Sequence, residues 1–231
     1  MHAAVLEATA VGPGTTLLDL GCGTGLFARA ATDRGARVTG IDLDPAAVAR
    51  ATAEVPEGVF VVGDAEEPPS GPFDVVAAVQ LLMHVADPVA VLAAAGRAGA
   101  VVAATVWGQE EECDVRAFGE ALAPWLGQRP PSGSLITEPA RLRAVAERAG
   151  LDVERVERVV CPFDYADEEE VLGAVFDSAL GRAVGRRAGP VVLREALLER
   201  LAPYRTAPGG YRLENVFRVI VAHRIGSAGR P

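Results

Sequence analysis

The chain has 231 residues, a length that fits one large domain or one domain with a modest insertion. Half of the residues are hydrophobic, the net charge at pH 7 is −9, and all 22 basic residues are arginines. An acidic chain without a basic block is a poor nucleic-acid binder, because binding to phosphates needs clustered positive charge. We therefore expect no nucleic-acid partner, and the absence of lysine removes that residue from any catalytic role.

The cysteines and the hydropathy pattern indicate a cytoplasmic protein. Three cysteines, Cys22, Cys113 and Cys161, lie far apart and form neither a metal-ligand spacing nor a disulfide framework. The N-terminus lacks the basic region, apolar core and cleavage site of a secretion signal, and no apolar run approaches membrane-spanning length. We expect no bound metal and no membrane partner.

A glycine-rich turn follows the first predicted strand. Residues 1–10 have a helical composition, Thr16–Leu20 is an apolar strand, and a helix-like segment covers residues 26–34. Glycine occupies every second position of the turn between this strand and this helix: Gly21, Gly23 and Gly25. Glycine lets the backbone approach a ligand closely, and the first amides of a helix present free N–H groups to it. A ligand is therefore expected at the carboxyl edge of the first strand.

Asp19, two residues before the first glycine, separates two kinds of ligand. Dinucleotide-binding folds use the spacing G-x-G-x-x-G and bind a diphosphate at the helix N-terminus. A carboxylate at Asp19 would repel a diphosphate but suits an ammonium group, so we infer a nucleoside that carries an amino acid. The stretch Asp19-x-Gly21-x-Gly23-x-Gly25 resembles motif I of class I S-adenosylmethionine-dependent methyltransferases. A tight turn without a ligand is the alternative.

The next two predicted strands also end in acids. Asp42 ends the strand over residues 37–42, about twenty residues after the glycine turn, where such folds place a carboxylate that accepts the ribose hydroxyls. Asp64 ends the strand over residues 58–65. In the family that the chain resembles, this position holds the adenine amino group, which implies Asp64 and the backbone of Ala65. The alternatives are an exposed strand-end acid for Asp42 and a turn-forming aspartate for Asp64.

A fourth predicted strand, Phe73–Gln80, is almost continuously apolar, as expected for a strand buried on both faces. Gln80 ends it at the same edge as the acids. Residues 81–88 resemble the segment after strand four in ubiquinone-biosynthesis-type methyltransferases. His84 in this segment is the best candidate for a general base, because histidine titrates near neutral pH. Its apolar neighbours also allow a place in the core or on a helix surface.

Beyond the fifth predicted strand, residues 100–106, the chain departs from the shared scaffold. Two more strands are expected over residues 151–163 and 211–224, and the roughly forty residues between them are too many for a hairpin. Residues 167–208 have apolar positions at three- and four-residue steps, so we interpret them as a helical cap. The cap lines a substrate pocket, or its apolar stripes pack on the sheet, on each other or on a second subunit. Other predicted segments are a helix over 112–126, a Pro/Gly loop over Gln128–Ser134, and a helix that Thr137 caps and that ends at Ala149.

The resemblance covers about residues 15–108 well and the rest in outline. It implies a Rossmann-like α/β fold: a seven-stranded sheet, mostly parallel with an antiparallel last strand, and helices on both faces. The cap predicted from periodicity would be inserted between strands six and seven, which are joined by a short connection in the family. Residues 1–166 and 209–231 would form the methyltransferase domain. S-adenosylmethionine would be the cofactor and S-adenosylhomocysteine its product. The implied cofactor-binding residues are Asp19, Gly21, Cys22, Gly23, Gly25, Asp42, Leu43, Asp64, Ala65 and Gln80.

Methyl transfer from a sulfonium is an in-line displacement, which depends on positioning two reactants. The resemblance implies an acceptor O, N or C atom on a small organic molecule, and a monomer or homodimer. The amide of Gln80, where an acid would bind metal, argues against metal-dependent catechol methylation. Trp107, Tyr211 and Asn215 are candidate substrate contacts, although turn and strand-edge roles fit the last two equally well.

Two other classes of function remain. A nicotinamide-dependent oxidoreductase is disfavoured by the glycine spacing and by Asp19. A protein that uses the same fold as a cyclase, an isomerase or a binding module would keep the same pocket, so only product analysis separates it from a methyltransferase. The arginine-only, alanine-rich composition suggests a high-GC genome of the kind in which such enzymes often tailor natural products.

Overall fold

The computed structural model describes residues 1–126 and 135–225 of the chain. The predicted Pro/Gly loop over residues 128–134 lies outside the described residues. In the described part of the chain, no helix combines the length and the apolar composition that crossing a membrane requires. The described residues separate into two compact units.

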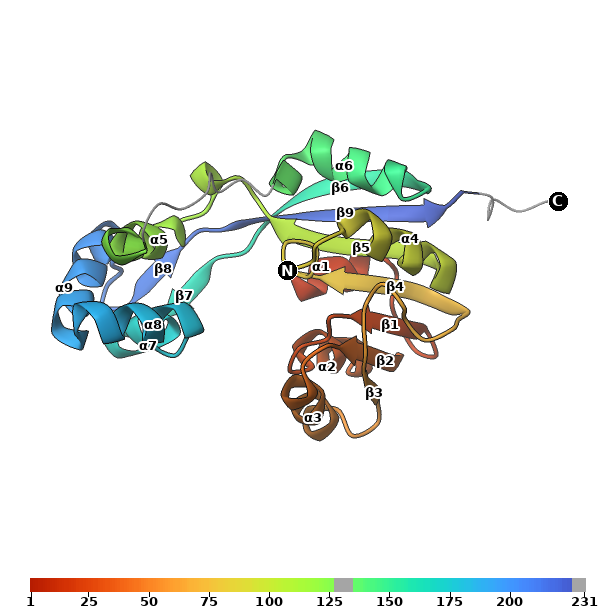
Figure 1. The fold of residues 1–231 in the computed structure, drawn as a ribbon, viewed down its shortest axis with the longest axis horizontal. Helices are drawn as coiled ribbons and strands as arrows, with labels where there is room; N and C mark the ends of the chain where they lie inside the picture. Colours follow the sequence, from red (N-terminus) through yellow and green to blue (C-terminus); the bar gives the residue numbers. More distant parts are fainter. Residues whose placement is uncertain (127–134, 226–231) are drawn as a thin grey trace. The chain divides into compact units, whose positions relative to one another are not determined.

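The first unit is built on a seven-stranded sheet and comprises residues 1–107, 135–159 and 217–225. Its strands are β1 (Thr16–Leu20), β2 (Arg37–Asp42), β3 (Val59–Val62), β4 (Phe73–Val79), β5 (Gly99–Trp107), β6 (Leu151–Val160) and β9 (Val216–Arg224). The strand order is β3-β2-β1-β4-β5-β9-β6 (Figure 1). The strands from β1 to β5 pair in parallel, whereas β9 is antiparallel to β5. This sheet confirms the predicted Rossmann-like α/β fold.

Helices pack on both faces of this sheet. They are α1 (His2–Ala8), α2 (Leu26–Thr32), α3 (Pro45–Glu54), α4 (Pro88–Ala98) and α6 (Pro139–Arg148). Successive strand residues point to opposite faces, so Leu17 packs in a cluster with Phe27 of α2, whereas Leu18 packs in another cluster with Leu92 of α4 and Leu142 of α6. Two apolar cores therefore hold the sheet between them, and they leave its carboxyl edge for polar residues.

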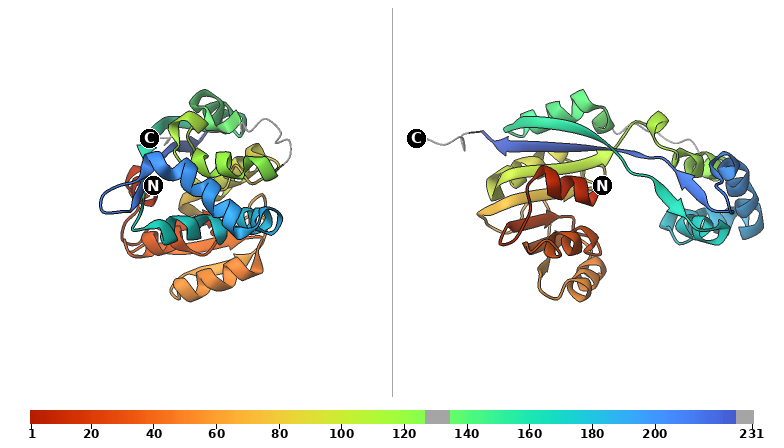
Figure 2. Two further views of the ribbon diagram at one scale, coloured as in Figure 1. Left: turned by 90° about the vertical axis from the view of Figure 1, so that its left-hand side faces the viewer. Right: turned by 180° about the vertical axis from the view of Figure 1, so that it is seen from behind.

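The second unit comprises residues 108–126 and 160–216 and has its own apolar core. Its elements are α5 (Arg116–Leu122), β7 (Phe163–Tyr165), α7 (Glu168–Phe176), α8 (Ala179–Ala188), α9 (Pro190–Leu201) and β8 (Tyr211–Leu213). The strands β7 and β8 pair antiparallel, and the later helices, teal to blue in Figure 2, share one core with them. The second unit thus contains residues 167–208 and extends beyond them. A role of this segment as an active-site cap stays a prediction.

Two predicted strands are each divided in the structure. The strand expected over 151–163 ends as β6 at Val160, and β7 is a separate strand, because Pro162 between them has no backbone donor for a sheet. The strand expected over 211–224 is divided into β8 and β9 at Asn215. The side chain of Asn215 accepts a hydrogen bond from Val115 N–H and donates one to the Leu213 carbonyl, so it holds an irregular turn.

Two helix predictions were also wrong in detail. Thr137 does not cap α6, because Pro139 occupies the first position of the helix and makes Glu138 the N-cap residue. Thr137 instead ends a short 3-10 helix. The helix expected over 112–126 is shorter, since α5 gives way at Ala123 to a 3-10 turn that contains Pro124.

Candidate cofactor site

The strands β1, β2 and β4 bring three polar residues to one edge of the first unit. Asp19 of β1 lies in register with Gly40 of β2 and Ala77 of β4. Asp42 ends β2, and Gln80 follows β4. Because neighbouring parallel strands end at the same edge of the sheet, both residues lie close to Asp19. The sequence predicted this convergence from the three strand ends, and the fold provides it.

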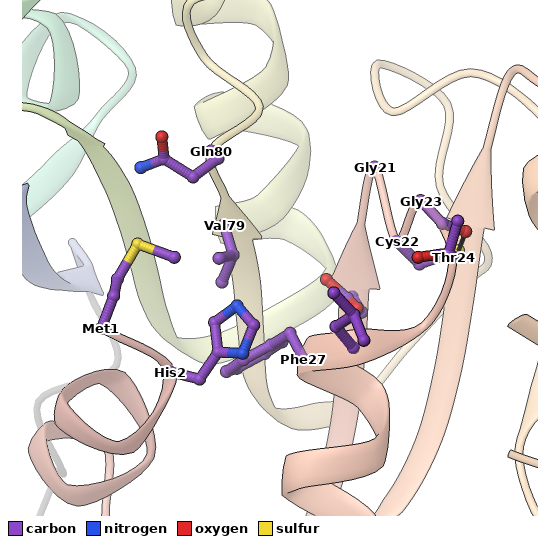
Figure 3. Close-up of a pocket in the computed structure, with 11 residues that line it drawn as sticks. Met1, His2, Gly21, Cys22, Gly23, Thr24, Phe27, Val79 and Gln80 are labelled. Atoms are coloured by element: carbon purple, nitrogen blue, oxygen red, sulfur yellow. Dashed lines mark hydrogen bonds between the residues drawn. The ribbon is translucent and has the colours of Figure 1, made fainter. Parts of the chain in front are cut away.

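Two cavities of about 300 Å³ each lie at this edge. The first cavity is lined by the start of α1, the glycine turn, the start of α2 and the end of β4 (Figure 3). The second cavity is lined by the ends of β2 and β3 and by residues 80–85. Gly21 and Gln80 line both cavities, so the two spaces adjoin there.

Asp19 lies on the wall of the first cavity and has only 1% of its surface exposed. Its Oδ2 atom has no hydrogen-bond partner among the residues that the structure describes. Burial, together with the nearby charge of Asp42, raises the pKa of Asp19 to about 8. A buried oxygen without a partner is costly, and a cationic ligand in the cavity would satisfy it. The site therefore fits the ammonium group of an amino acid.

The glycine turn has a backbone shape that other residues adopt only with strain. Gly21, Gly23 and Gly25 have φ angles of +68°, +53° and +88°. A Cβ on Gly21 would lie 2.6 Å from the Leu81 side chain, and one on Gly25 would lie 3.0 Å from the Cα of Ala51. A Cβ on Gly23 would meet nothing within 4 Å. The turn thus packs tightly at its two ends and leaves open space at its centre, where a ligand can approach.

Asp42 has a structural role that the sequence did not reveal. Its Oδ2 atom accepts a hydrogen bond from Gly23 N–H at 2.8 Å, and its Oδ1 atom accepts one from Asp44 N–H at 2.9 Å. These bonds connect the end of β2 to the glycine turn and to the start of α3. A carboxylate has about four lone-pair sites, so acceptor capacity remains for ribose hydroxyls in the second cavity, and the ribose role stays a prediction.

The far end of the second cavity combines an acid with apolar surface. Asp64 accepts a hydrogen bond from Glu66 N–H at 2.9 Å, the turn contact that was the alternative to ligand binding. Asp64 and Ala65 both line the cavity, as does Leu43, which is 69% exposed. An exposed leucine beside free carboxylate capacity suits a flat base with an amino group. The adenine role of these residues stays a prediction.

Gln80 is held in an unusual conformation where the cavities adjoin. Its φ angle is +57°, which is uncommon for a residue other than glycine and persists only where the surroundings enforce it. The hydroxyl of buried Thr105 accepts hydrogen bonds from Gln80 N–H at 2.9 Å and from its side-chain Nε2 at 3.0 Å. Thr105 lies inside an apolar strand, and no spacing in the sequence connected it to Gln80.

Two histidines lie at the site, in different cavities. His84 is exposed and lines the second cavity, and its catalytic role stays a prediction. His2, which the sequence did not single out, lines the first cavity beside Phe27 (Figure 3). His2 and the glycine turn are far apart in the sequence, so no local pattern predicted that they line the same cavity. Helical periodicity in residues 1–10 could have shown on which helix face His2 lies.

The remaining predicted residues have contacts of their own. The thiol of Cys22 has its pKa raised to about 12 by burial and by the charges of Asp19 and Asp42, so it is not a nucleophile at neutral pH. Trp107 packs against Phe217, with 4.4 Å between ring centroids, and lines neither of these two cavities. Buried Tyr211 and Asn215 belong to the second unit, where the hydroxyl of Tyr211 accepts a hydrogen bond from an arginine side chain. Their substrate contacts stay predictions.

Known proteins resemble this chain in sequence and in fold. A family model described as a methyltransferase domain matches residues 18–99. The chain is 36% identical over 160 residues to the ubiquinone biosynthesis O-methyltransferase of Pseudomonas paraeruginosa, which covers 62% of this chain and 67% of that protein. Its fold matches the cyclase SpnF with a TM-score of 0.63 and 23% identity, covering 96% and 80% of the two chains. It also matches the magnesium protoporphyrin IX methyltransferase of Synechocystis, with a TM-score of 0.57 and 16% identity. This match covers 96% of this chain and 79% of that protein.

The chain belongs to the class I S-adenosylmethionine-dependent methyltransferases. Its relatives at 36% identity are O-methyltransferases, whereas the solved structures, all below 25% identity here, show the fold alone. This membership confirms the predicted family, S-adenosylmethionine as the cofactor, and methyl transfer to a small molecule as the function. The buried Asp19 oxygen and the open centre of the glycine turn fit that cofactor.

Proposed function

We propose that this methyltransferase acts on a hydroxyl oxygen of a small organic molecule. Its relatives with up to 39% identity are named O-methyltransferases of ubiquinone biosynthesis, which supports oxygen as the acceptor atom. The observation that supports the cofactor site is Asp19, a buried carboxylate on a cavity wall whose Oδ2 atom has no hydrogen-bond partner in the described part of the chain. An amino-acid ammonium group satisfies that oxygen, and a diphosphate does not.

Each part of the cofactor has its own residues in this proposal. Asp19 and the glycine turn bind the methionine moiety in the first cavity. Asp42 accepts the ribose hydroxyls in the second cavity, and Asp64 with the backbone of Ala65 contacts the adenine. Gln80 lies where the cavities adjoin, and so beside the junction between methionine and nucleoside.

The chain contributes position and electrostatics to the reaction. Bound S-adenosylmethionine supplies a methyl group activated by a positively charged sulfur. Thr105 fixes the amide of Gln80, whose partial negative charge at oxygen favours a neighbouring cation. Phe27 and Val79 give the first cavity apolar surface that limits water near the reacting atoms. Catalysis then follows from holding the acceptor oxygen in line with the methyl group.

We further propose that the protein works in the cytoplasm as a monomer or homodimer and has no nucleic-acid partner. The few scattered cysteines support the cytoplasm, and the acidic composition without a basic block supports the lack of a nucleic-acid partner. We also propose that residues 167–208 form a helical cap. The support is that α7, α8 and α9 share one apolar core with α5.

A cyclase or isomerase with the same fold is the second candidate, because SpnF, a cyclase, has a similar fold. Calorimetric titration and product analysis separate these functions. We expect micromolar binding of S-adenosylmethionine and S-adenosylhomocysteine and none of NAD. We also expect a mass increase of one methyl group on catechol or on members of a panel of substituted phenols. Tight binding of both sulfur nucleosides without methylation of any O, N or C acceptor would favour the cyclase or binding-module function.

A further inference from the structure

His2 faces the interior of the first unit because of its place on α1. Val5 and Leu6 of this helix are completely or almost completely buried. Residues three and four positions apart lie on one helix face, so His2 shares the buried face and its ring is turned toward α2. There it meets Phe27 in an edge-to-face contact, with 5.6 Å between ring centroids and 69° between ring planes. Packing thus fixes the ring on the wall of the first cavity.

The surroundings of His2 keep its imidazole neutral at neutral pH. Burial lowers the pKa of His2 below its ordinary value of 6.5, and the charged amino group of Met1 lowers it further. The other titratable groups on this cavity wall are the carboxyl of Asp19 and the thiol of Cys22. A neutral, half-buried imidazole on the cavity wall can accept a proton from an acceptor hydroxyl.

His84 has the opposite setting. It is exposed, and it lines the cavity that also contains Asp42 and Asp64, the residues assigned to ribose and adenine. Gln80, which marks the junction where the reactive methyl group would lie, lines both cavities, but the cavity of His2 also contains Asp19, the residue assigned to the methionine moiety. Figure 3 shows His2 and Phe27 beside Val79, with Gln80 at the end of the same strand. In the proposed assignment, His2 therefore lies on the side of the methionine moiety, whereas His84 lies on the side of the ribose and the adenine.

We propose that His2, rather than His84, is the general base of the methyl transfer, an inference that rests on the proposed function. A hydroxyl acceptor gives its proton to an imidazole nitrogen of His2 while its oxygen forms a bond to the methyl carbon. The bond between that carbon and sulfur breaks, and sulfur keeps the electron pair. The proton ends on His2 and leaves with solvent after the methylated product departs.

Matched variants test this assignment. His2→Gln keeps a polar side chain of similar length but has no titrating group. His84→Gln tests the rival histidine in the other cavity, and His223→Gln, at a histidine of β9 that contacts Glu154 and lines neither cavity, is the matched control. With catechol or another phenol that the wild-type protein methylates, we expect His2→Gln to lower kcat about 100-fold or more. The acidic limb of the pH profile of kcat should disappear in this variant. Its dissociation constant for S-adenosylhomocysteine should change less than threefold. His223→Gln should keep both kcat and the acidic limb, and His84→Gln should lower kcat less than His2→Gln does.

A second measurement uses the three histidines of the chain as NMR probes. In the complex with S-adenosylhomocysteine, addition of phenols should shift the imidazole signals of His2 and leave those of His84 in place. An unshifted His2 signal with the whole panel would overturn the assignment. It would also fail if His84→Gln caused the larger loss of kcat, or if His2→Gln weakened nucleoside binding and left kcat unchanged. Failure of the wild-type protein to bind either sulfur nucleoside would instead overturn the proposed function.

Discussion

Burial of the Asp19 carboxyl lowers the folding stability of the ligand-free protein. The pKa of Asp19 in the folded protein is about 8, against an ordinary value of 3.8, so the folded state holds a proton that the unfolded state has released. Stability therefore falls as the pH rises from about 4 to about 8, because the unfolded state binds fewer protons over this range. A cation beside Asp19 would stabilise its ionised carboxylate. Without that cation, ionisation of the buried carboxyl lowers the free energy of unfolding.

Asp19→Asn should move binding and stability in opposite directions. Loss of a charge-assisted hydrogen bond of about 1.5–3 kcal/mol should weaken S-adenosylhomocysteine binding about 10- to 150-fold. The melting temperature of the free variant should exceed that of the wild type, by more at pH 8 than at pH 5. Calorimetry and thermal unfolding measure the two effects. Asp152→Asn, on an exposed carboxylate of β6, is the matched control and should change neither.

Cofactor binding should depend on pH through Asp19. Below pH 8 the free protein holds Asp19 protonated, and the ligand's ammonium group favours the ionised form. The dissociation constant should therefore fall as pH rises from about 6 to 8, by up to about tenfold per unit. Titrations in buffers with different ionisation enthalpies should show up to about one proton released per ligand at pH 6.5. Binding independent of pH in the wild type would contradict this role of Asp19.

The ribose contact proposed for Asp42 can be measured separately from its structural role. If its carboxylate accepts the ribose hydroxyls, the wild type should bind S-adenosylhomocysteine about tenfold more tightly than the 2′-deoxy analogue, a loss typical of one hydrogen bond. Asp42→Ala should bind both weakly and with equal affinity. It should also lose stability, because Gly23 N–H and Asp44 N–H lose their acceptors. Continued discrimination between the two nucleosides in Asp42→Ala would refute the ribose contact.

At the scale of elements, the glycine turn connects β1 to α2 and lines the proposed cofactor site. Gly25→Ala places a Cβ 3.0 Å from the backbone of Ala51 in addition to forcing a non-glycine residue to a φ of +88°. Gly150→Ala forces a similar φ of +77°, but its Cβ would meet no atom of the described residues within 4 Å. We expect Gly150→Ala to cost about 1 kcal/mol and Gly25→Ala about 2–3 kcal/mol more, in urea unfolding. Equal losses would show that α3 moves aside easily.

The elements that the sequence predicted well are those with local signals. The strands β1 to β5 are apolar runs that end in acids or turns, and Asp44 with Pro45 marks the start of α3 by its own capping hydrogen bond. Non-local contacts decided the rest. The break at Asn215 depends on Val115, a hundred residues away, and Gln80 depends on Thr105 from the neighbouring strand. His2 joins the site only because α1 packs against α2.

At the scale of the whole molecule, the chain is two units with different relations to known proteins. The family model covers residues 18–99, all within the first unit, where the proposed cofactor-binding residues also lie. The second unit has its own core around Leu193, Leu197 and Leu201 of α9. Each unit thus has the apolar core that separate folding stability requires.

Ligand protection tests whether the units open separately. The chain has no lysine, so trypsin cleaves only after its arginines. S-adenosylhomocysteine at about 100 times its dissociation constant should stabilise the first unit by about 2.7 kcal/mol and slow cleavage at Arg29 and Arg34 about 100-fold. Cleavage at Arg182 and Arg187 of the second unit should keep its rate. Equal protection of all four sites, measured by mass spectrometry, would show that the two units unfold together.

The second unit is assembled from residues 108–126 and 160–216, with chain of the first unit between them. This division affects how such a protein can be recombined. A single crossover between two related genes inside the second unit would join half of one apolar core to half of another, and most such chimeras would be poorly packed. Transplanting the unit intact requires replacing two stretches at once, with β6 and α6 left in place between them. Any change of acceptor that depends on this unit is therefore expected to accumulate by point substitution rather than by exchange of a module.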